Sequence, residues 1–329
     1  MEELVLKTIK KYDLIKSGDK IVLAVSGGPD SIFMFDILNK LKEKLNFEIV
    51  VCHVNHMIRE EAINDEKFVK EICNKFNIEY YVKRIDVTNY ANNNKIGTEE
   101  AGRIVRYDFF EKILEKTGSN KIAVAHNKND KVETIIMNLL RGTGILGLKG
   151  IEPNRDNKYI RPIIEIERKD IEKYCEENNL KPRIDKTNFE NIYTRNKIRN
   201  IVLPYIEKEF NPNIIESISR LSEIATEEDE YLNKITKSVY NEMLIEVKKD
   251  EIILDLKIFN KQDKVIKKRL VIYTINKLMG TSCGIEKIHI EDIIKLCENN
   301  IGNKYLTPNK NIKFLVNKGK IFIQLQQNY

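Results

Sequence analysis

The sequence lacks the features that mark several large classes of protein. No uncharged apolar stretch approaches the ~18 residues that a membrane-spanning helix needs, so we expect no membrane segment. The first residues, MEELVLKTIKKYDL, are amphipathic and have no apolar run before a small-residue cleavage site. That pattern argues against a signal peptide, and we therefore expect a cytoplasmic protein.

The sequence has few cysteines, and their spacing does not suit a metal site or a C-x-x-C pair. Five cysteines stand at positions 52, 73, 175, 283 and 297, and no two of them form a C-x-x-C pair or another metal-ligand spacing. An odd number of unpaired cysteines predicts reduced, mostly buried thiols rather than a disulfide framework. Lys and Arg exceed Asp and Glu by only 56 to 50, which permits an anionic partner without requiring one.

The chain has 329 residues, enough for two domains, and 42% of them are hydrophobic, enough to bury a core. Its first part alternates strand and helix patterns, which is typical of an α/β, doubly wound parallel sheet. Residues 21–25 are a continuous apolar run, as expected for a strand buried on both faces. The other predicted strands are 48–54, 78–85 and 121–126, and the predicted helices are 31–45, 64–76, 99–116 and 130–140.

The pattern changes after about residue 150. A helix is predicted at 168–178, a helical region at 205–247, a strand at 251–257, helices at 264–279 and 287–299, and a hairpin turning at 317–320. These elements predict a second, smaller, mainly helical α+β domain. We place the domains at 1–205 and 206–329.

A glycine-rich turn follows the first predicted strand, in the sequence Ser26-Gly27-Gly28-Pro29-Asp30-Ser31. Successive glycines let the backbone approach an anion closely, because no Cβ intervenes. The N–H groups at the start of the next helix then point at phosphate oxygens, and Pro at the first helical turn loses no needed hydrogen bond. This strand–turn–helix arrangement predicts a phosphate site. An ordinary turn that binds nothing is the alternative.

Two other nucleotide signatures do not fit. The chain has no G-x-x-x-x-G-K-[ST] motif, so a Walker-A loop is excluded. Residues 142–147 do spell G-x-G-x-x-G, but they follow a predicted helix rather than a strand. We expect a flexible loop near the site there.

Several sequence blocks, taken in order over about residues 20–200, resemble the tRNA(Ile)-lysidine synthetase family of the PP-loop ATP pyrophosphatases. The S-G-G-x-D-S turn carries the superfamily resemblance. The further blocks are H-V-N-H-x-x-R at 53–59, E-A-G-R-I-V-R-Y at 100–107, A-H-x-x-x-D-x-x-E-T at 125–134 with L-L-R-G-T-G at 139–144, Arg161-Pro162, and D-K-T-N at 185–188 before R-N-K-I-R at 195–199.

The resemblance implies an ATP-dependent ligase that joins free L-lysine to C2 of the wobble cytidine of tRNA(Ile) with a CAU anticodon. AMP and pyrophosphate are the other products. It implies ATP as substrate, held by residues 26–31 and His53, and Mg²⁺ as cofactor. It also implies catalytic roles for Asp30, Arg106, His126, Asp130 and Glu133, and tRNA contacts at Arg103, Arg141, Asn188, Arg195 and Arg199.

The residues support these roles independently. His126 ends the predicted strand at 121–126, and Asp130 and Glu133 lie one and two turns into the next helix. Their i, i+4, i+7 spacing puts all three on one face near the carboxyl edge of the sheet. We predict that Asp30 and Asp130 hold Mg²⁺, and that Asp130 or Glu133 meets the attacking amine. Exposed helix charges beside a core histidine are the alternative.

Basic residues suggest where an anion binds. Arg103 and Arg106 are one turn apart on a predicted helix and suit charge developing at phosphorus. Residues 181–200 carry six basic against two acidic side chains with Phe189 and Tyr193 interleaved, and 302–320 carry five lysines and no acid. Both segments are candidate RNA surfaces, with solvated loops as the alternative.

Two departures from the family pattern are visible. Asn129 stands where family members often have a second acidic residue, and Gly102 replaces a common Ala within a helix. Longer family members carry a further C-terminal domain, and we expect this chain to end before it. Whether the protein is a homodimer is left open.

Three other functions were weighed. A PP-loop enzyme that thiolates tRNA would commonly need paired cysteines, which the sequence lacks. A PP-loop amidating enzyme would need an ammonia-supplying domain or partner. A non-catalytic RNA-binding protein would have no reason to keep the turn at 26–31 together with Asp130 and Glu133.

Overall fold

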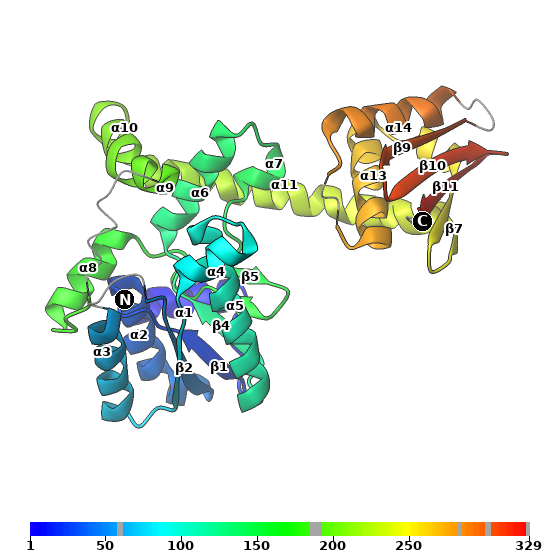
Figure 1. Cartoon of the computed structure of the whole chain (residues 1–329). Coiled ribbons are helices and arrows are strands. Elements are labelled where there is room, and N and C mark those ends of the chain that lie inside the picture. Colours follow the sequence, from blue (N-terminus) through cyan, green and yellow to red (C-terminus); the bar gives the residue numbers. More distant parts are fainter. Residues whose placement is uncertain (58–61, 184–192, 282–283, 300–303, 327–329) are drawn as a thin grey trace. The chain divides into compact units, whose positions relative to one another are not determined.

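The computed structural model describes residues 1–57, 62–183, 193–281, 284–299 and 304–326. The chain divides into two compact units, Met1–Ala225 and Thr226–Tyr329. Each unit has a sheet of its own, and Figure 1 labels elements of both units where there is room.

The first unit contains a six-stranded sheet in the order β3-β2-β1-β4-β6-β5. All neighbouring pairs are parallel except β5 with β6. The doubly wound parallel sheet predicted from the sequence is therefore confirmed. Its strands are β1 (Lys20–Ala24), β2 (Glu48–Asn55), β3 (Tyr80–Arg84), β4 (Lys121–Val124), β5 (Asn154–Arg155) and β6 (Tyr159–Ile160).

Helices cover both faces of this sheet. Side chains of β1 alternate between two cores: Ile21 and Leu23 pack on one face, and Val22 packs on the other. This alternation explains why the strand is apolar at every position. The helices of this unit are α1 (Glu2–Lys11), α2 (Pro29–Leu45), α3 (Ala62–Lys75), α4 (Val87–Asn94), α5 (Thr98–Thr117), α6 (Lys128–Leu140), α7 (Ile145–Leu148), α8 (Arg168–Glu177), α9 (Thr194–Lys197), a π-helical turn (Ile198–Val202) and α10 (Leu203–Glu209).

The helix α11 (Ile214–Met243) carries the boundary between the units, which falls after Ala225 rather than after residue 205. The reason is packing. Ile198, Leu203 and Ile215 share an apolar cluster with Val132 and Ile136 of α6, so the segment following the predicted boundary belongs to the first unit.

The sequence analysis missed the short elements. The helix α4 has a polar, Asn-rich sequence, and it is stabilised at its start by the side chain of Asp86, which accepts a hydrogen bond from the Asn89 backbone. The strands β5 and β6 have two residues each, too few for a periodicity to show. Residues 142–147, expected to be a flexible loop, include α7.

The second unit is built on a five-stranded antiparallel sheet in the order β7-β8-β11-β10-β9. The predicted hairpin is confirmed between β10 and β11, where Lys318 and Gly319 both have positive φ. The edge strands β7 and β9 were not predicted. The elements are β7 (Leu244–Val247), β8 (Glu251–Asp255), α12 (Leu256–Asn260), α13 (Lys264–Met279), α14 (Lys287–Asn299), β9 (Lys304–Asn309), β10 (Ile312–Asn317) and β11 (Lys320–Leu325).

Within the described ranges, none of the helices is both long enough and apolar enough to cross a membrane.

The four described cysteines are buried free thiols, as the sequence predicted. Burial raises the pKa of each to about 12, so they stay protonated at neutral pH. They are Cys52, Cys73, Cys175 and Cys297. Cys283 lies outside the described residues.

Gly102→Ala is expected to stabilise the protein by about 1 kcal/mol, because Gly is a poor residue for a helix interior. A Cβ at this position of α5 would lie 3.7 Å from both His56 Cε1 and Val87 Cγ1, which is ordinary contact. The check is the midpoint of urea unfolding. Gly147→Ala is the contrasting variant, because its Cβ would come within 2.6 Å of Thr143 Cβ, and it should lose stability. A drop in midpoint for Gly102→Ala would contradict the prediction.

Candidate active site

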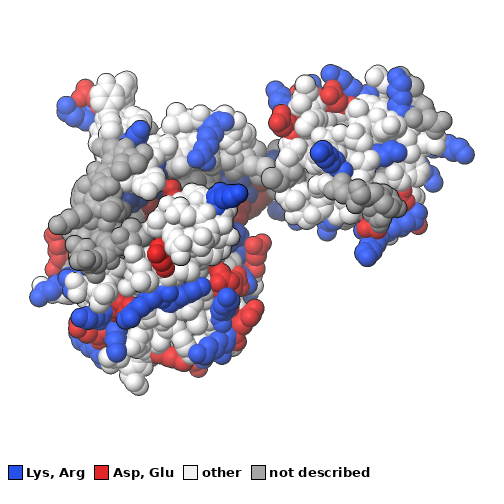
Figure 2. Space-filling model, in the orientation of Figure 1, with Lys and Arg blue, Asp and Glu red and all other residues white. Residues whose placement is uncertain are grey.

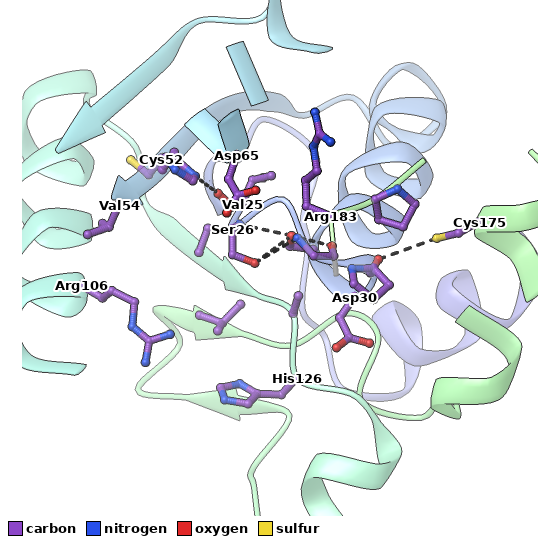
Figure 3. Close-up of a pocket in the computed structure, with 18 of the residues that line it drawn as sticks. Val25, Ser26, Asp30, Cys52, Val54, Asp65, Arg106, His126, Cys175 and Arg183 are labelled. Carbon is purple, nitrogen blue, oxygen red and sulfur yellow. Dashed lines mark hydrogen bonds between the residues drawn. The ribbon is translucent and has the colours of Figure 1, made fainter. Parts of the chain in front are cut away.

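A cavity of about 1460 Å³ opens at the carboxyl ends of β1, β2 and β4, the edge at which doubly wound sheets bind ligands. Small-molecule sites commonly enclose roughly 300–1,000 Å³, so this cavity has room for more than one substrate. Figure 3 shows side chains from several elements converging on it.

The glycine-rich turn forms one wall of this cavity. Gly27 has φ +96, a conformation that favours glycine, and α2 begins at Pro29 with Gly28 as its N-cap. The Ser31 hydroxyl accepts hydrogen bonds from the N–H groups of Ser26 at 3.2 Å and Gly27 at 3.1 Å, and it donates to the Gly28 carbonyl at 2.9 Å. Ser31 therefore fixes the shape of the turn, and the first residues of α2 line the cavity.

The segment after α8 folds back over the turn. The Arg183 N–H donates to the Gly27 carbonyl at 2.9 Å, and Lys181, Pro182 and Arg183 all line the cavity. On α8 itself, the Cys175 thiol lies 3.9 Å from the Pro29 carbonyl oxygen. Sequence reasoning noticed the charges of this segment but had no signal for its return to the turn.

Asp30 projects into the cavity from the first turn of α2 (Figure 3). Asn127, which the sequence analysis did not single out, donates a hydrogen bond to Asp30 Oδ1 at 2.8 Å. Burial, and then the nearby charge of Asp130, raise the pKa of Asp30 to about 6. Its carboxylate thus becomes fully charged only above that pH.

Asp130 and Glu133 are buried, not exposed helix charges, and they form ion pairs with three arginines. Glu133 accepts from Arg199 Nε at 2.7 Å and Nη2 at 2.8 Å, and from Arg195 Nε at 3.0 Å. Asp130 Oδ1 lies 3.1 Å from Arg199 Nη2 and 3.3 Å from Arg168 Nη2. Arg168 Nη1 also reaches Glu133 Oε1 at 3.3 Å.

This network positions basic groups for the cavity. Arg168 and Arg199 line the cavity, whereas Asp130 and Glu133 are not among its lining residues. Arg199 lies in the π-helical turn Ile198–Val202, a rare conformation often found at functional sites. Arg168 was not predicted. The two carboxylates therefore fix the positions of the arginines that they bind.

The predicted Mg²⁺ pair fits only in part. Asp130 Oδ2 accepts the Asn127 N–H at 3.1 Å, and Oδ1 accepts from Arg168 and Arg199, whose positive charges oppose a second cation beside it. Among the described residues, no three His, Cys, Asp or Glu side chains are grouped to hold a metal. Asp30 remains the carboxylate of the pair that is suited to Mg²⁺ bound together with phosphate oxygens.

His126 lies between β4 and α6, which begins at Lys128 with Asn127 as its N-cap. It lines the cavity, and in Figure 3 Arg106 points toward the same region. Desolvation and the charge of Arg161 hold the pKa of His126 well below its usual value. Arg161 Nε donates to His126 Nδ1 at 3.3 Å, so the neutral ring carries its proton on Nε2. His126 can therefore donate a hydrogen bond to a ligand through Nε2, whereas its Nδ1 already accepts from Arg161.

His53 and His56 place unpaired ring nitrogens beside the cavity. His53 Nδ1 bonds the Val25 carbonyl at 2.9 Å, so its Nε2 is an acceptor, and that buried atom has no partner among the described residues. Burial lowers the pKa of His53, and desolvation with the charge of Arg106 lowers that of His56 to about 4. Both rings are neutral at pH 7, and His53 Nε2 suits a ligand N–H donor.

The predicted tRNA contacts are spread over different places. Arg103 lines the cavity from α5, and Arg195 anchors to Glu133. Arg141 is exposed at the end of α6, and neither it nor the 142–147 segment lines the cavity. Asn188 lies outside the described residues.

Comparison with known proteins agrees with this geometry. A family model described as a PP-loop domain matches residues 1–206. A U34-tRNA thiolase from Methanococcus maripaludis superposes with a TM-score of 0.56 and 21% identity, covering 69% of this chain and 78% of that one, which shows a shared fold.

Two curated relatives are more similar in sequence. The tRNA(Ile)-lysidine synthase of Clostridium acetobutylicum is 46% identical over 98% of this chain and 70% of its own length. That of Caldanaerobacter subterraneus is 46% identical over 94% of this chain and 66% of its own. The chain belongs to the tRNA(Ile)-lysidine synthase family and carries the PP-loop domain in residues 1–206.

Proposed function

We propose that this protein forms lysidine on tRNA(Ile), as an ATP-dependent carbon–nitrogen ligase. The observation that carries the proposal is the meeting, in one cavity, of the turn at 26–31 with Arg106, His126, Arg168 and Arg199. A phosphate site and a group of cationic donors are what cleavage between the α and β phosphates of ATP requires.

The first step adenylates the base. The C2 carbonyl oxygen of the wobble cytidine attacks the α-phosphorus of ATP, and pyrophosphate leaves. We assign the departing pyrophosphate to the turn at 26–31 and the growing charge at phosphorus to Arg106. His53 Nε2, an unpaired acceptor, suits the exocyclic amine of adenine.

The second step attaches lysine. Its ε-ammonium loses a proton, the amine attacks the activated C2, and AMP leaves. Because Asp130 and Glu133 already form ion pairs with arginines, we assign the cationic amines of lysine to other carboxylates, which line the cavity. Glu172 and Glu176, one turn apart on α8, are the candidates.

Mg²⁺ would be held by Asp30 together with phosphate oxygens, and it would offset charge on ATP. We also place the reaction in the cytoplasm, the compartment shared by tRNA, ATP and free lysine. A homodimer stays a prediction.

The test is pyrophosphate release from ATP by the purified chain, with and without a tRNA(Ile) transcript bearing the CAU anticodon and free lysine. We expect release to require the tRNA, and radiolabelled lysine to become fixed to it. A methionine tRNA transcript with the same anticodon is the control. Release with a small acceptor and no RNA, or sulfur transfer in place of lysine, would overturn the proposal.

A further inference from the structure

Charge alone does not locate a nucleic-acid surface on the face of the first unit seen in Figure 2. Figure 2 shows its Lys and Arg side chains interspersed with Asp and Glu on the visible face. An RNA contact on this face must therefore depend on particular basic side chains and their geometry, rather than on a large patch of one sign.

One group of side chains beside the cavity has such a geometry. Arg103 and Tyr107 lie on α5, and Arg155 and Tyr159 lie on β5 and β6. The Arg103 guanidinium lies 4.7 Å from the Tyr107 ring centroid, and Arg155 lies 5.4 Å from that ring and 4.2 Å from the Tyr159 ring. The two rings are 5.1 Å apart. We call these four residues the Arg–Tyr ladder.

The Tyr159 end of the ladder is fixed in the protein interior. Tyr159 is buried, and its hydroxyl donates to the Glu111 carboxylate. Contact with the aromatic rings restricts both guanidinium groups, so less side-chain entropy remains to be lost when a ligand binds. Arg155 has a weak partner in Asp156 at 3.9 Å, whereas Arg103 has no acidic partner within the described ranges.

Among the four ladder residues, Arg103 is the one whose position suits contact with the RNA substrate. It is exposed, it lines the cavity together with Tyr107, and its charge reaches His126 strongly enough to help lower the pKa of that ring. The phosphate-binding turn is on β1 and α2, whereas the ladder comes from α5, β5 and β6. We therefore assign the ladder to the RNA and leave the charge at phosphorus to Arg106, one turn further along α5.

We propose that the Arg103 guanidinium, supported by Tyr107, stacks on an unpaired base next to the nucleotide that enters the cavity. Unpaired RNA bases stack on arginine planes and aromatic rings, and a planar guanidinium can do this where an ammonium cannot. The inference rests on the proposed function, because it takes the partner to be a tRNA loop.

The experiment compares variants of the full chain for equilibrium binding of the tRNA(Ile) transcript over a range of salt concentrations. Arg103→Lys keeps the charge and removes the plane, so we expect about a five- to tenfold weaker tRNA affinity with an unchanged salt slope. ATP affinity should stay within about twofold. Tyr107→Leu should weaken tRNA binding in the same direction, because it removes the support.

Lys116→Ala is the matched control. Lys116 lies on the same helix, with its ammonium 4.5 Å from the Tyr81 ring centroid, and it does not line the cavity, so tRNA binding should not change. The inference would be overturned if Arg103→Lys bound tRNA with wild-type affinity, while Arg103→Ala bound tRNA more weakly and with a salt slope lower by about one. That pair of results would show that Arg103 contacts a phosphate. Absence of tRNA binding by the wild type would instead overturn the proposed function.

Discussion

Asp30→Asn is expected to raise the free energy of unfolding above pH 6 while it abolishes turnover. The pKa of Asp30 rises from 3.8 unfolded to about 6 folded, so the folded state binds more protons between these values. Unfolding free energy therefore falls as pH rises through this window. A shift of this size corresponds to roughly 3 kcal/mol, which the uncharged Asn recovers. Asn also keeps an oxygen to accept the hydrogen bond of Asn127.

The measurement is urea unfolding of wild type and variant at pH 8 and pH 5. The gain in stability should be largest at pH 8 and shrink at pH 5, where the wild-type carboxyl is mostly protonated. Turnover of ATP should fall by at least about a hundredfold, because the proposed Mg²⁺ ligand is lost. Asp108→Asn is the control, because its partners Lys112 and Lys83 lower the pKa of that exposed carboxyl and the variant should gain nothing at pH 8. A less stable Asp30→Asn protein at pH 8 would refute the argument.

Glu133→Gln is expected to destabilise the first unit by about 3–5 kcal/mol, the usual cost of removing one partner of a buried ion pair. Glu133 is fully buried, and its oxygens accept from Arg195 and Arg199. Gln has a similar shape but places an N–H₂ group against guanidinium donors. Arg199 would then lose its fixed place in the cavity, so turnover should fall as well.

Chemical unfolding and turnover together test this role. Replacing one partner of an exposed pair, as in Asp108→Asn beside Lys112 at 3.1 Å, should cost under ~1 kcal/mol. If Glu133 acted on substrate rather than through its arginines, Glu133→Gln would lose activity while its unfolding midpoint stayed at the wild-type value. That result would restore the direct catalytic role predicted from the sequence.

Local signals predicted much of the fold. The continuous apolar run of β1 and the glycine turn after it are properties of adjacent residues, and the structure has both. The helices α13 and α14 have the predicted bounds. The edge strands β7 and β9 were missed because an edge strand is defined by the neighbour it pairs with rather than by its own pattern.

Asn129 stands where family members often have an acidic residue, and the sequence pattern alone does not reveal its role. Its side-chain oxygen accepts the backbone N–H of Arg168 at 2.9 Å, at the start of α8. The Asn129 amide oxygen thereby accepts one of the free backbone N–H groups at the N-terminus of α8. Among the described residues, the N-cap Glu167 makes no side-chain cap hydrogen bond there. The role of Asn129 therefore depends on a partner 39 positions further along the chain.

The sequence by itself determined the glycine-rich turn at 26–31, the doubly wound sheet and the family, because each depends on residue order within short blocks. Only the tertiary structure decided that Asp130 and Glu133 are buried and paired with arginines. Charged side chains on a helix are exposed by default, and burial is tolerated here because Arg168, Arg195 and Arg199 converge on them from two distant segments. Long-range convergence of this kind leaves no periodicity in the sequence, so it appears only when the chain is folded.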